Sequence, residues 1–213
     1  ALGHLGGALL ALGRHDEARV TFERALALRR QAIGAEDPAI NGILAGLGGT
    51  LAALGEHDEA IPILERALSL REELGVDKFH LAPILNNLGR SLRQLGRHEE
   101  ARRMHERALA LQEAALGPSH ANVAASLLGL GELALARGEP ALALPLLERA
   151  LTLHSVEDHA NVQLALAEAL WPSEQDRPRA RALATAAQEH WRGLGHQPNL
   201  ARATAWLATH PGV

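Results

Sequence analysis

The sequence repeats with a period of about 42 residues, and this feature constrains its possible folds more than any other. Four stretches share one pattern: "GRHDEARVTFERALAL" (13–28), "GEHDEAIPILERALSL" (55–70), "GRHEEARRMHERALAL" (96–111) and "GEPALALPLLERALTL" (138–153). Their shared alanines, at positions 18, 60, 101 and 143, are separated by steps of 42, 41 and 42 residues. A fixed period of this length is typical of stacked structural units.

Each copy contains two segments with helical periodicity. In copy two, the first segment places Leu44, Leu47, Leu51 and Leu54 on one helical stripe. A break at "GEHD" follows, and Asp58 is the predicted N-cap of the second helix. Each copy is therefore expected to form a helix, a tight turn and a second helix. Neither helix can bury its stripe alone, so stacked copies would build one continuous core.

Small residues recur where the two helices of a copy are expected to meet. A Leu–Gly pair precedes every second segment, and its glycine lies 12 residues before the shared alanine. In copy two this pairing predicts that Gly48 faces Ala60 near the turn. The absence of bulk at both positions would let the two backbones approach closely.

The composition agrees with an all-α chain and excludes several classes of function. Leucine and alanine, the strongest helix formers, dominate the apolar 47% of the sequence. No cysteine is present, so disulfides and thiolate metal sites are excluded. The net charge of −4 gives no case for nucleic acid. No apolar run approaches the ~18 residues that a membrane span requires. We expect a cytoplasmic protein.

The stretch "GILAGLGGTLAALG" (42–55) resembles a phosphate-binding loop only at first sight. Such a loop needs a preceding strand and a lysine directly after its glycines. The single lysine of the chain is Lys78, far downstream, and no β-rich run precedes Gly42. We interpret this stretch as the first helix of copy two. One hypothesis for its many glycines is a smooth wall of a binding groove.

The pattern Leu-x-x-Leu-Gly, then Gly-x-x-x-x-Ala, then Ala resembles the tetratricopeptide repeat. The usual period is ~34 residues, so the longer period here implies longer helices. This length, together with "LNNLGRSLRQLGRHEEARRMHERALALQEAALGPSHANVAASL" (85–127), resembles the kinesin-light-chain type of repeat, in which the Asn86–Asn87 pair is a hallmark. The family's large aromatic residues are replaced here, for example by Leu44 and His105.

The resemblance implies an all-α, right-handed α-α superhelix. Four repeats would span 1–33 (truncated at its N-terminus), 34–74, 75–116 and 117–155, followed by a degenerate fifth repeat at 156–195 and a capping helix at 196–213. Such arrays are often attached to bacterial serine/threonine kinases, and the end of the chain looks like the tail of those proteins. All three tryptophans lie in this last part, where we expect them to seal the end of the array.

The sequence gives little support for an enzyme or a metal protein. Nucleophile, metalloprotease, dinucleotide-binding and kinase motifs are all missing. His15, His57 and His98 recur one repeat apart, on the order of 10 Å for stacked helices. That separation is too large for one zinc ion, whose ligands lie at ~2 Å. We expect no enzymatic activity, no cofactor and no metal.

A binding groove remains as the candidate site. In tetratricopeptide arrays the first helices line the concave face, and transferring this by register gives a wall that is small early and polar in copy three. The predicted peptide-binding residues are Asn86, Asn87, Arg90, Arg93, Gln94 and Glu132. Asparagine can both donate to and accept from a peptide backbone, and arginine can hold a carboxylate. The alternative is that these are ordinary solvent-facing polar residues.

The expected partner is a protein or peptide, extended and acidic, bound by a scaffold or adaptor. An alternative is a regulatory or sensor domain of a larger bacterial signalling protein, a serine/threonine kinase or transcription regulator, that binds its own linker or a peptide signal. Self-association through the truncated N-terminal repeat is also expected, because that repeat would have an uncovered outer face.

Overall fold

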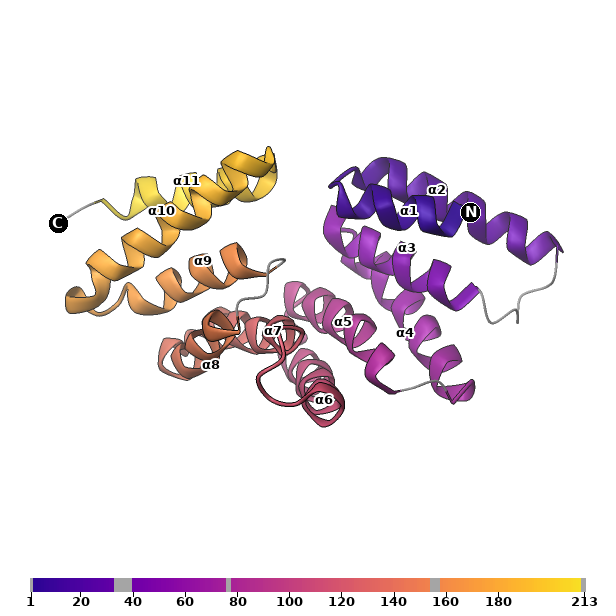
Figure 1. The fold of residues 1–213 in the computed structure, drawn as a ribbon, viewed down its shortest axis with the longest axis horizontal. Coiled ribbons are helices and arrows are strands. Elements are labelled where there is room, and N and C mark those ends of the chain that lie inside the picture. The colour runs from indigo at the N-terminus through magenta and orange to yellow at the C-terminus, as the bar shows by residue number, and fades with distance from the viewer. Residues whose placement is uncertain (1, 33–39, 76–77, 154–157, 212–213) are drawn as a thin grey trace. The chain divides into compact units, whose positions relative to one another are not determined.

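The computed structural model describes residues 2–32, 40–75, 78–153 and 158–211. Within these ranges every regular element is a helix (Figure 1). The chain divides into two compact units, Ala1–Leu111 (unit 1) and Gln112–Val213 (unit 2). No helix in the described ranges is long and apolar enough to cross a membrane.

Helices follow one another in hairpins. Unit 1 contains α1 (Leu2–Ala11), α2 (His15–Ala32), α3 (Ile40–Leu54), α4 (His57–Glu73), the short 3₁₀ helix η1 (Lys78–Leu81), α5 (Ala82–Gln94) and most of α6 (His98–Leu116). Unit 2 contains the end of α6, then α7 (Val123–Ala136), α8 (Pro140–Thr152), α9 (His159–Leu170), the 3₁₀ helix η2 (Glu174–Asp176), α10 (Arg177–Leu194) and α11 (Gln197–Thr209). The predicted all-α fold is confirmed, and residues 42–54 lie in a helix.

A glycine in the left-handed conformation ends the first helix of each copy. Gly55, for example, has φ +83°, a value that side chains with a Cβ rarely adopt. The second helix then begins almost at once, because α4 starts at His57 with Glu56 as its N-cap. The predicted N-cap at Asp58 is therefore wrong. Asp58 lies in the first turn instead, where its negative charge is favourable beside the helix N-terminus.

The glycine shared by the first helices makes room for a large side chain of the second helix. A Cβ placed on Gly48 would lie 2.6 Å from Leu64 Cγ. Gly6, Gly89 and Gly131 meet Phe22, His105 and Leu147 in the same way. The side chain nearest to Gly48 is therefore Leu64, one helical turn after the predicted Ala60. Close packing of the two helices thus pairs a missing side chain with a large one.

Phe22 explains a further glycine. Its ring lies between Gly6 of its own copy and Gly46 of the next, and a Cβ on Gly46 would come within 2.4 Å of the ring. The hypothesis of a smooth groove wall does not hold for Gly46, because this glycine packs against the Phe22 ring. Gly7 and Gly42, in contrast, face open space.

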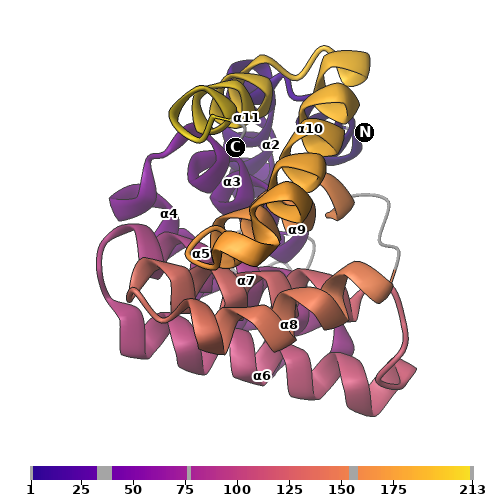
Figure 2. The same ribbon diagram turned by 90° about the vertical axis from the view of Figure 1, so that its left-hand side faces the viewer.

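Unit 2 stacks its helices in chain order. α7 packs on α8, α8 on α9, α9 on α10, and α10 on α11 (Figure 2). Trp191 is buried in this unit. Trp171 and Trp206 meet edge to face with ring centroids 5.5 Å apart, and His210 stacks on Trp206 at 4.2 Å. These aromatic contacts fasten α11 to the end of α9, which agrees with the predicted sealing role.

Candidate functional site

The candidate surface of unit 1 is formed by the first helices of its three copies. α1 contacts α3, and α3 contacts α5, so these helices lie side by side. α1 and α3 contain no Asp, Glu, Lys or Arg, whereas α5 contains Arg90 and Arg93 and no acidic residue. All other charged groups in the helices of unit 1 belong to α2, α4, η1 or α6. The first-helix surface therefore carries its Arg side chains on α5 alone, and His4 of α1 is a further titratable residue on it.

Five predicted site residues lie on α5. Asn86, Asn87 and Arg93 are half-buried, while Arg90 and Gln94 are exposed. Arg90 Nη2 donates to Asn87 Oδ1 at 2.8 Å. The Asn87 amide also extends toward the preceding first helix, where its Nδ2 would lie 3.0 Å from a Cβ on Gly49. The structure thus brings Asn87 and Arg90 together and places the Asn87 amide beside Gly49 of α3.

Asn86 is directed to the interior of unit 1. Its Oδ1 lies 3.0 Å from Nδ1 of His105, which is 2% exposed. Burial, with the nearby charges of Arg93 and Arg90, lowers the pKa of His105 to about 4, so the ring is neutral near pH 7. With the amide oxygen as acceptor, Nδ1 carries the proton. Asn86 therefore orients a buried histidine, a contact that the repeat pattern did not reveal.

Arg90 and Arg93 act on a second histidine. Burial and the charges of Arg90 and Arg93 lower the pKa of His57, which lies at the start of α4. His57 Nδ1 is 3.4 Å from Ser91 Oγ on α5. The positive charges of Arg90 and Arg93 thus lie together on α5 and act on both histidines.

Glu132 belongs to unit 2, whereas the five α5 residues belong to unit 1. It is on α7, with 16% of its side chain exposed, and its carboxylate lies 3.7 Å from Arg202 Nη1 on α11. Arg202 also donates to Glu168 on α9 at 3.1 Å. The sequence pattern missed this arrangement because Arg202 lies beyond the clear repeats.

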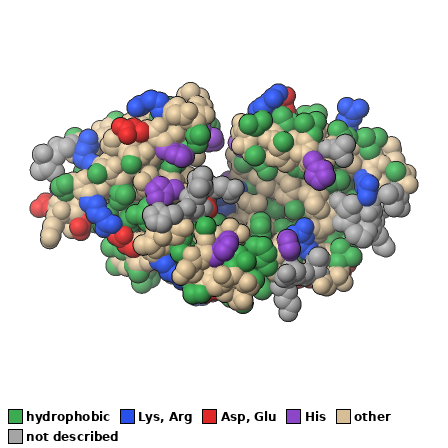
Figure 3. Space-filling model, in the orientation of Figure 1, with side chains coloured by type: hydrophobic (Ala, Val, Ile, Leu, Met, Phe, Trp, Pro, Cys, Tyr) green, Lys and Arg blue, Asp and Glu red, His purple; other side chains and the backbone are tan. Residues whose placement is uncertain are grey.

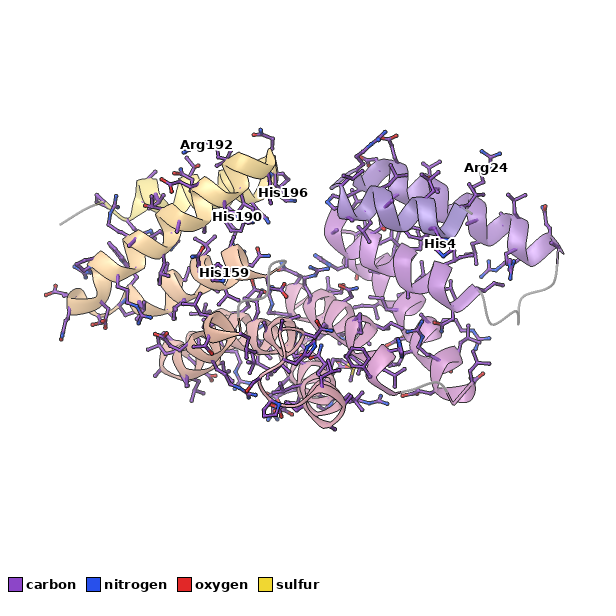
Figure 4. The ribbon with its side chains drawn as sticks, in the orientation of Figure 1. His4, Arg24, His159, His190, Arg192 and His196 are labelled. Atoms are coloured by element: carbon purple, nitrogen blue, oxygen red, sulfur yellow. The ribbon has the colours of Figure 1, made fainter. Side chains whose placement is uncertain are left out.

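The described histidines of unit 2 lie at or near helix ends. His159 lies at the start of α9, and His190 and His196 lie near the end of α10 (Figure 4). Among the described residues, no group of three or more His, Cys, Asp or Glu side chains is arranged to hold a metal ion. His196 instead accepts from the backbone N–H of Asn199 at 3.4 Å and caps α11.

Comparison with known proteins identifies the repeats. A family model described as tetratricopeptide repeat matches residues 1–73 and 80–155, and a second model with the same description matches residues 128–193. The chain belongs to the tetratricopeptide repeat family. The matched residues include the Leu–Gly pairs and the shared alanines from which the repeat was recognised. No curated protein matches this tetratricopeptide chain.

Solved structures show the same fold. BtubC (BKLC) from P. vanneervenii has a TM-score of 0.68 and 24% identity, covering 91% of this chain and 80% of that chain. A putative kinesin light chain with nearly identical TPR-like repeats, from Podospora anserina, has a TM-score of 0.65 and 20% identity, covering 92% and 95%. Both solved structures thus share the helical-repeat fold of this tetratricopeptide chain.

A third similar structure is a regulator. The Rap conjugation gene regulator of plasmid pLS20, in complex with the Phr* peptide, has a TM-score of 0.82 and 14% identity. The match covers 98% of this chain and 57% of that chain. At such identities the likeness establishes the tetratricopeptide fold and nothing about the ligand. The fold itself is that of a protein-interaction module.

Proposed function

We propose that this chain is a non-enzymatic scaffold or adaptor that binds an extended, acidic peptide segment along the first helices of unit 1. One observation carries the proposal: Arg90 and Arg93 are the only Asp, Glu, Lys or Arg residues on α1, α3 and α5. The two arginines of α5 would attract an acidic segment. The small side chains of α3 would let the backbone of that segment come close to the helix.

The chemistry of the α5 edge suits a peptide. Arg90 is exposed, and its planar guanidinium can hold a carboxylate through two parallel N–H donors. It also orients the neighbouring Asn87 amide through the 2.8 Å hydrogen bond. That amide can donate to a peptide carbonyl through Nδ2. Gln94, exposed one turn after Arg90, offers a second amide. No cofactor or metal is required for such binding.

Asn86 and Glu132 have narrower roles in this proposal. Asn86 contributes through His105, by keeping the second helix of copy three in place behind Arg90 and Arg93. Glu132 is paired with Arg202 and would contact a ligand only in unit 2. A basic side chain of the bound segment would have to compete with Arg202 there, so we expect Glu132 to contribute less than Arg90.

A second candidate function is a regulatory or sensor domain of a larger bacterial signalling protein, which binds its own linker or a peptide signal. Two similar structures favour it: the Rap conjugation gene regulator in complex with the Phr* peptide, and a Rap protein in complex with Competence and Sporulation Factor. The two functions share the same surface and differ in the source of the segment.

Binding to synthetic peptides tests the proposal. Fluorescent ten-residue peptides rich in Asp or Glu are titrated with the chain, beside peptides in which Lys replaces every acid. Wild-type protein should prefer the acidic series, with an affinity that falls as salt rises. The Arg90→Glu variant should lose at least ~tenfold in affinity, because a charge-assisted pair becomes a repulsive one.

The control variant carries the same change of charge elsewhere. Arg66→Glu alters an exposed arginine of α4, outside the first-helix surface. It should leave the affinity within about twofold, since exposed charges beyond one Debye length are largely screened. Circular dichroism must show that both variants fold. Equal loss in the two variants would mean that only net charge is sensed, and it would contradict a site on α5.

A further inference from the structure

His57 lies beside the two arginines of the proposed site, although it belongs to the preceding copy. It is the first residue of α4, which packs on α5. Its Nδ1 is 3.4 Å from Oγ of Ser91, a fully buried residue of α5. Ser91 directly follows Arg90 and stands two positions before Arg93. This contact therefore holds the imidazole against the segment of α5 that carries both arginines.

The preceding junction offers the same histidine without the arginines. His15 begins α2 as His57 begins α4, and α2 packs on α3. The register positions of the two arginines hold Gly49 and Ala52 in α3. Both histidines are half-buried. His15 is therefore a matched control for a histidine whose neighbouring first helix carries charge.

The charges that act on His57 come from α5 and from its own helix. Burial, followed by the charges of Arg90 and Arg93, lowers the pKa of His57, and Asp58 acts in the opposite direction. Like charges disfavour the protonated imidazole, so a group that offsets the arginines favours its protonation. A ligand carboxylate held by these arginines is such a group.

The other elements near His57 carry paired or distant charges. Glu56, the residue before it, is paired with Arg19 of α2 at 2.9 Å. α3 also packs on α4 and contains no Asp, Glu, Lys or Arg. η1 contacts α4 near its C-terminal end, where Arg71 donates to the backbone oxygen of His80 at 2.7 Å. The two arginines of α5 are therefore the cations that act on His57.

His105 does not suit the same role near neutral pH. Its ring is 2% exposed, and burial, with the charges of Arg93 and Arg90, lowers its pKa to about 4. Between about pH 5.5 and pH 8 this ring is therefore neutral. The half-buried His57 is the histidine beside the arginines that can take up a proton in that range.

We propose that binding of a carboxylate to Arg90 and Arg93 is coupled to the uptake of one proton by His57. The proton comes from the solvent and goes to the imidazole, which then adds a third positive charge to the site. The inference rests on the proposed function and supplies its regulation. Because the bound state holds more protons than the free state, an acidic segment should bind more tightly as pH falls.

NMR titration of the free chain tests the coupling without any peptide. The signal of the His57 ring is assigned by its loss in His57→Gln, and that of His15 by its loss in His15→Gln. The pKa of His57 should rise in Arg90→Gln and in Arg93→Gln, and most in the double variant, because each change removes a positive charge beside the ring. The titration of His15 should not move.

Binding of a peptide tests the consequence. A fluorescent ten-residue peptide rich in Asp and free of His is titrated with the chain at four pH values from 8 to 5.5, at constant ionic strength. Wild type should gain about two- to fivefold more affinity over this range than His57→Gln does, as uptake of up to one proton allows. Calorimetry in two buffers of different ionisation enthalpy should show the proton uptake directly.

The remaining histidines require a control. The sequence has 12, and histidines reach the surface of both units on the face that Figure 3 shows. His4, exposed on α1, also belongs to the first-helix surface (Figure 4). His15→Gln and His4→Gln should keep the difference in pH dependence that separates wild type from His57→Gln. Circular dichroism at each pH must show that all variants fold.

The outcomes separate this inference from the proposed function. If the acidic peptide binds and Arg90→Glu weakens it, while wild type and His57→Gln share one pH profile, the coupling is wrong and the binding site stands. A pKa of His57 that is the same in wild type and in the arginine variants would also overturn the coupling. If the acidic peptide is not preferred at any pH, both the proposed function and the coupling are wrong.

Discussion

The imidazole of His105 lies against the backbone of Gly89, so that a Cβ on this glycine would be 2.6 Å from Nε2. The equivalent positions in the other three copies hold Phe22, Leu64 and Leu147, all apolar. A titratable ring thus occupies a place built for a hydrocarbon. Its Nε2 is buried without a hydrogen-bond partner among the described residues.

The stability of unit 1 should therefore depend on pH. Burial lowers the pKa of His105 from 6.5 to about 4, so between these values the unfolded chain binds more protons than the folded chain. The free energy of unfolding should fall as pH decreases through this window, by about 1 kcal/mol per pH unit. His105→Leu should flatten this dependence, and urea unfolding at pH 7, 5.5 and 4.5 measures it. Unchanged pH dependence in the variant would assign the effect to other groups.

Gly48 and Gly42 should respond in opposite directions to alanine. A Cβ on Gly48 would lie 2.6 Å from Leu64 Cγ, so Gly48→Ala should destabilise the chain by roughly 1–3 kcal/mol through overpacking. Gly42 lies on the same helix, but a Cβ there would meet nothing within 4 Å. Gly42→Ala should therefore stabilise the chain by roughly 0.5–1 kcal/mol. Thermal unfolding of both variants checks the prediction, and a similar shift in both would show that helix propensity alone decides.

Removal of Trp206 should loosen the end of unit 2. Its ring contacts both Trp171 and His210, the latter at 4.2 Å between centroids. Trp206→Ala should cost roughly 2–4 kcal/mol, near the lower end for large aromatic truncations because the ring is only half-buried. Hydrogen exchange should show the loss of protection in α11 first. Uniform loss across unit 2 would mean that α11 does not open separately.

The buried pair of Ser126 and Gln112 allows a test by rescue. Ser126 Oγ donates to Gln112 Oε1 at 2.6 Å, and both residues are at most 4% exposed. Ser126→Ala removes this donor from a buried amide oxygen and should cost about 1–3 kcal/mol. Adding Gln112→Leu should recover part of that loss, because no polar group then stays unsatisfied. Additive losses in the double variant would show that the hydrogen bond is not the source of the effect.

The periodicity of the sequence was sufficient to predict the helices and their turns, because an apolar stripe and a turn glycine act locally. The contacts between helices were harder to predict. Leu64, and not the predicted Ala60, is the side chain nearest to Gly48, since the offset between two antiparallel helices depends on how their side chains interlock. Asp58 failed as an N-cap for a related reason: the left-handed Gly55 lets α4 begin earlier than the polar pattern indicates.

The candidate site was only partly predictable. The register identified α5 and its arginines, because surface position along a helix follows from spacing. The inward turn of Asn86 toward His105 depends on a residue 19 positions away. The pairing of Glu132 with Arg202 depends on α11, where the repeat has decayed. Contacts of this kind need the three-dimensional arrangement.

The Phe22 ring, held between Gly6 and Gly46, has a consequence for how the gene can change. Loss of one 41-residue period by unequal recombination would join copy one directly to copy three and put Asn87 where Gly46 now lies. The amide would then collide with the ring that Gly46 admits. Copies with similar sequences are therefore not interchangeable. Copy one can be followed only by a copy that has a small residue at the position of Gly46.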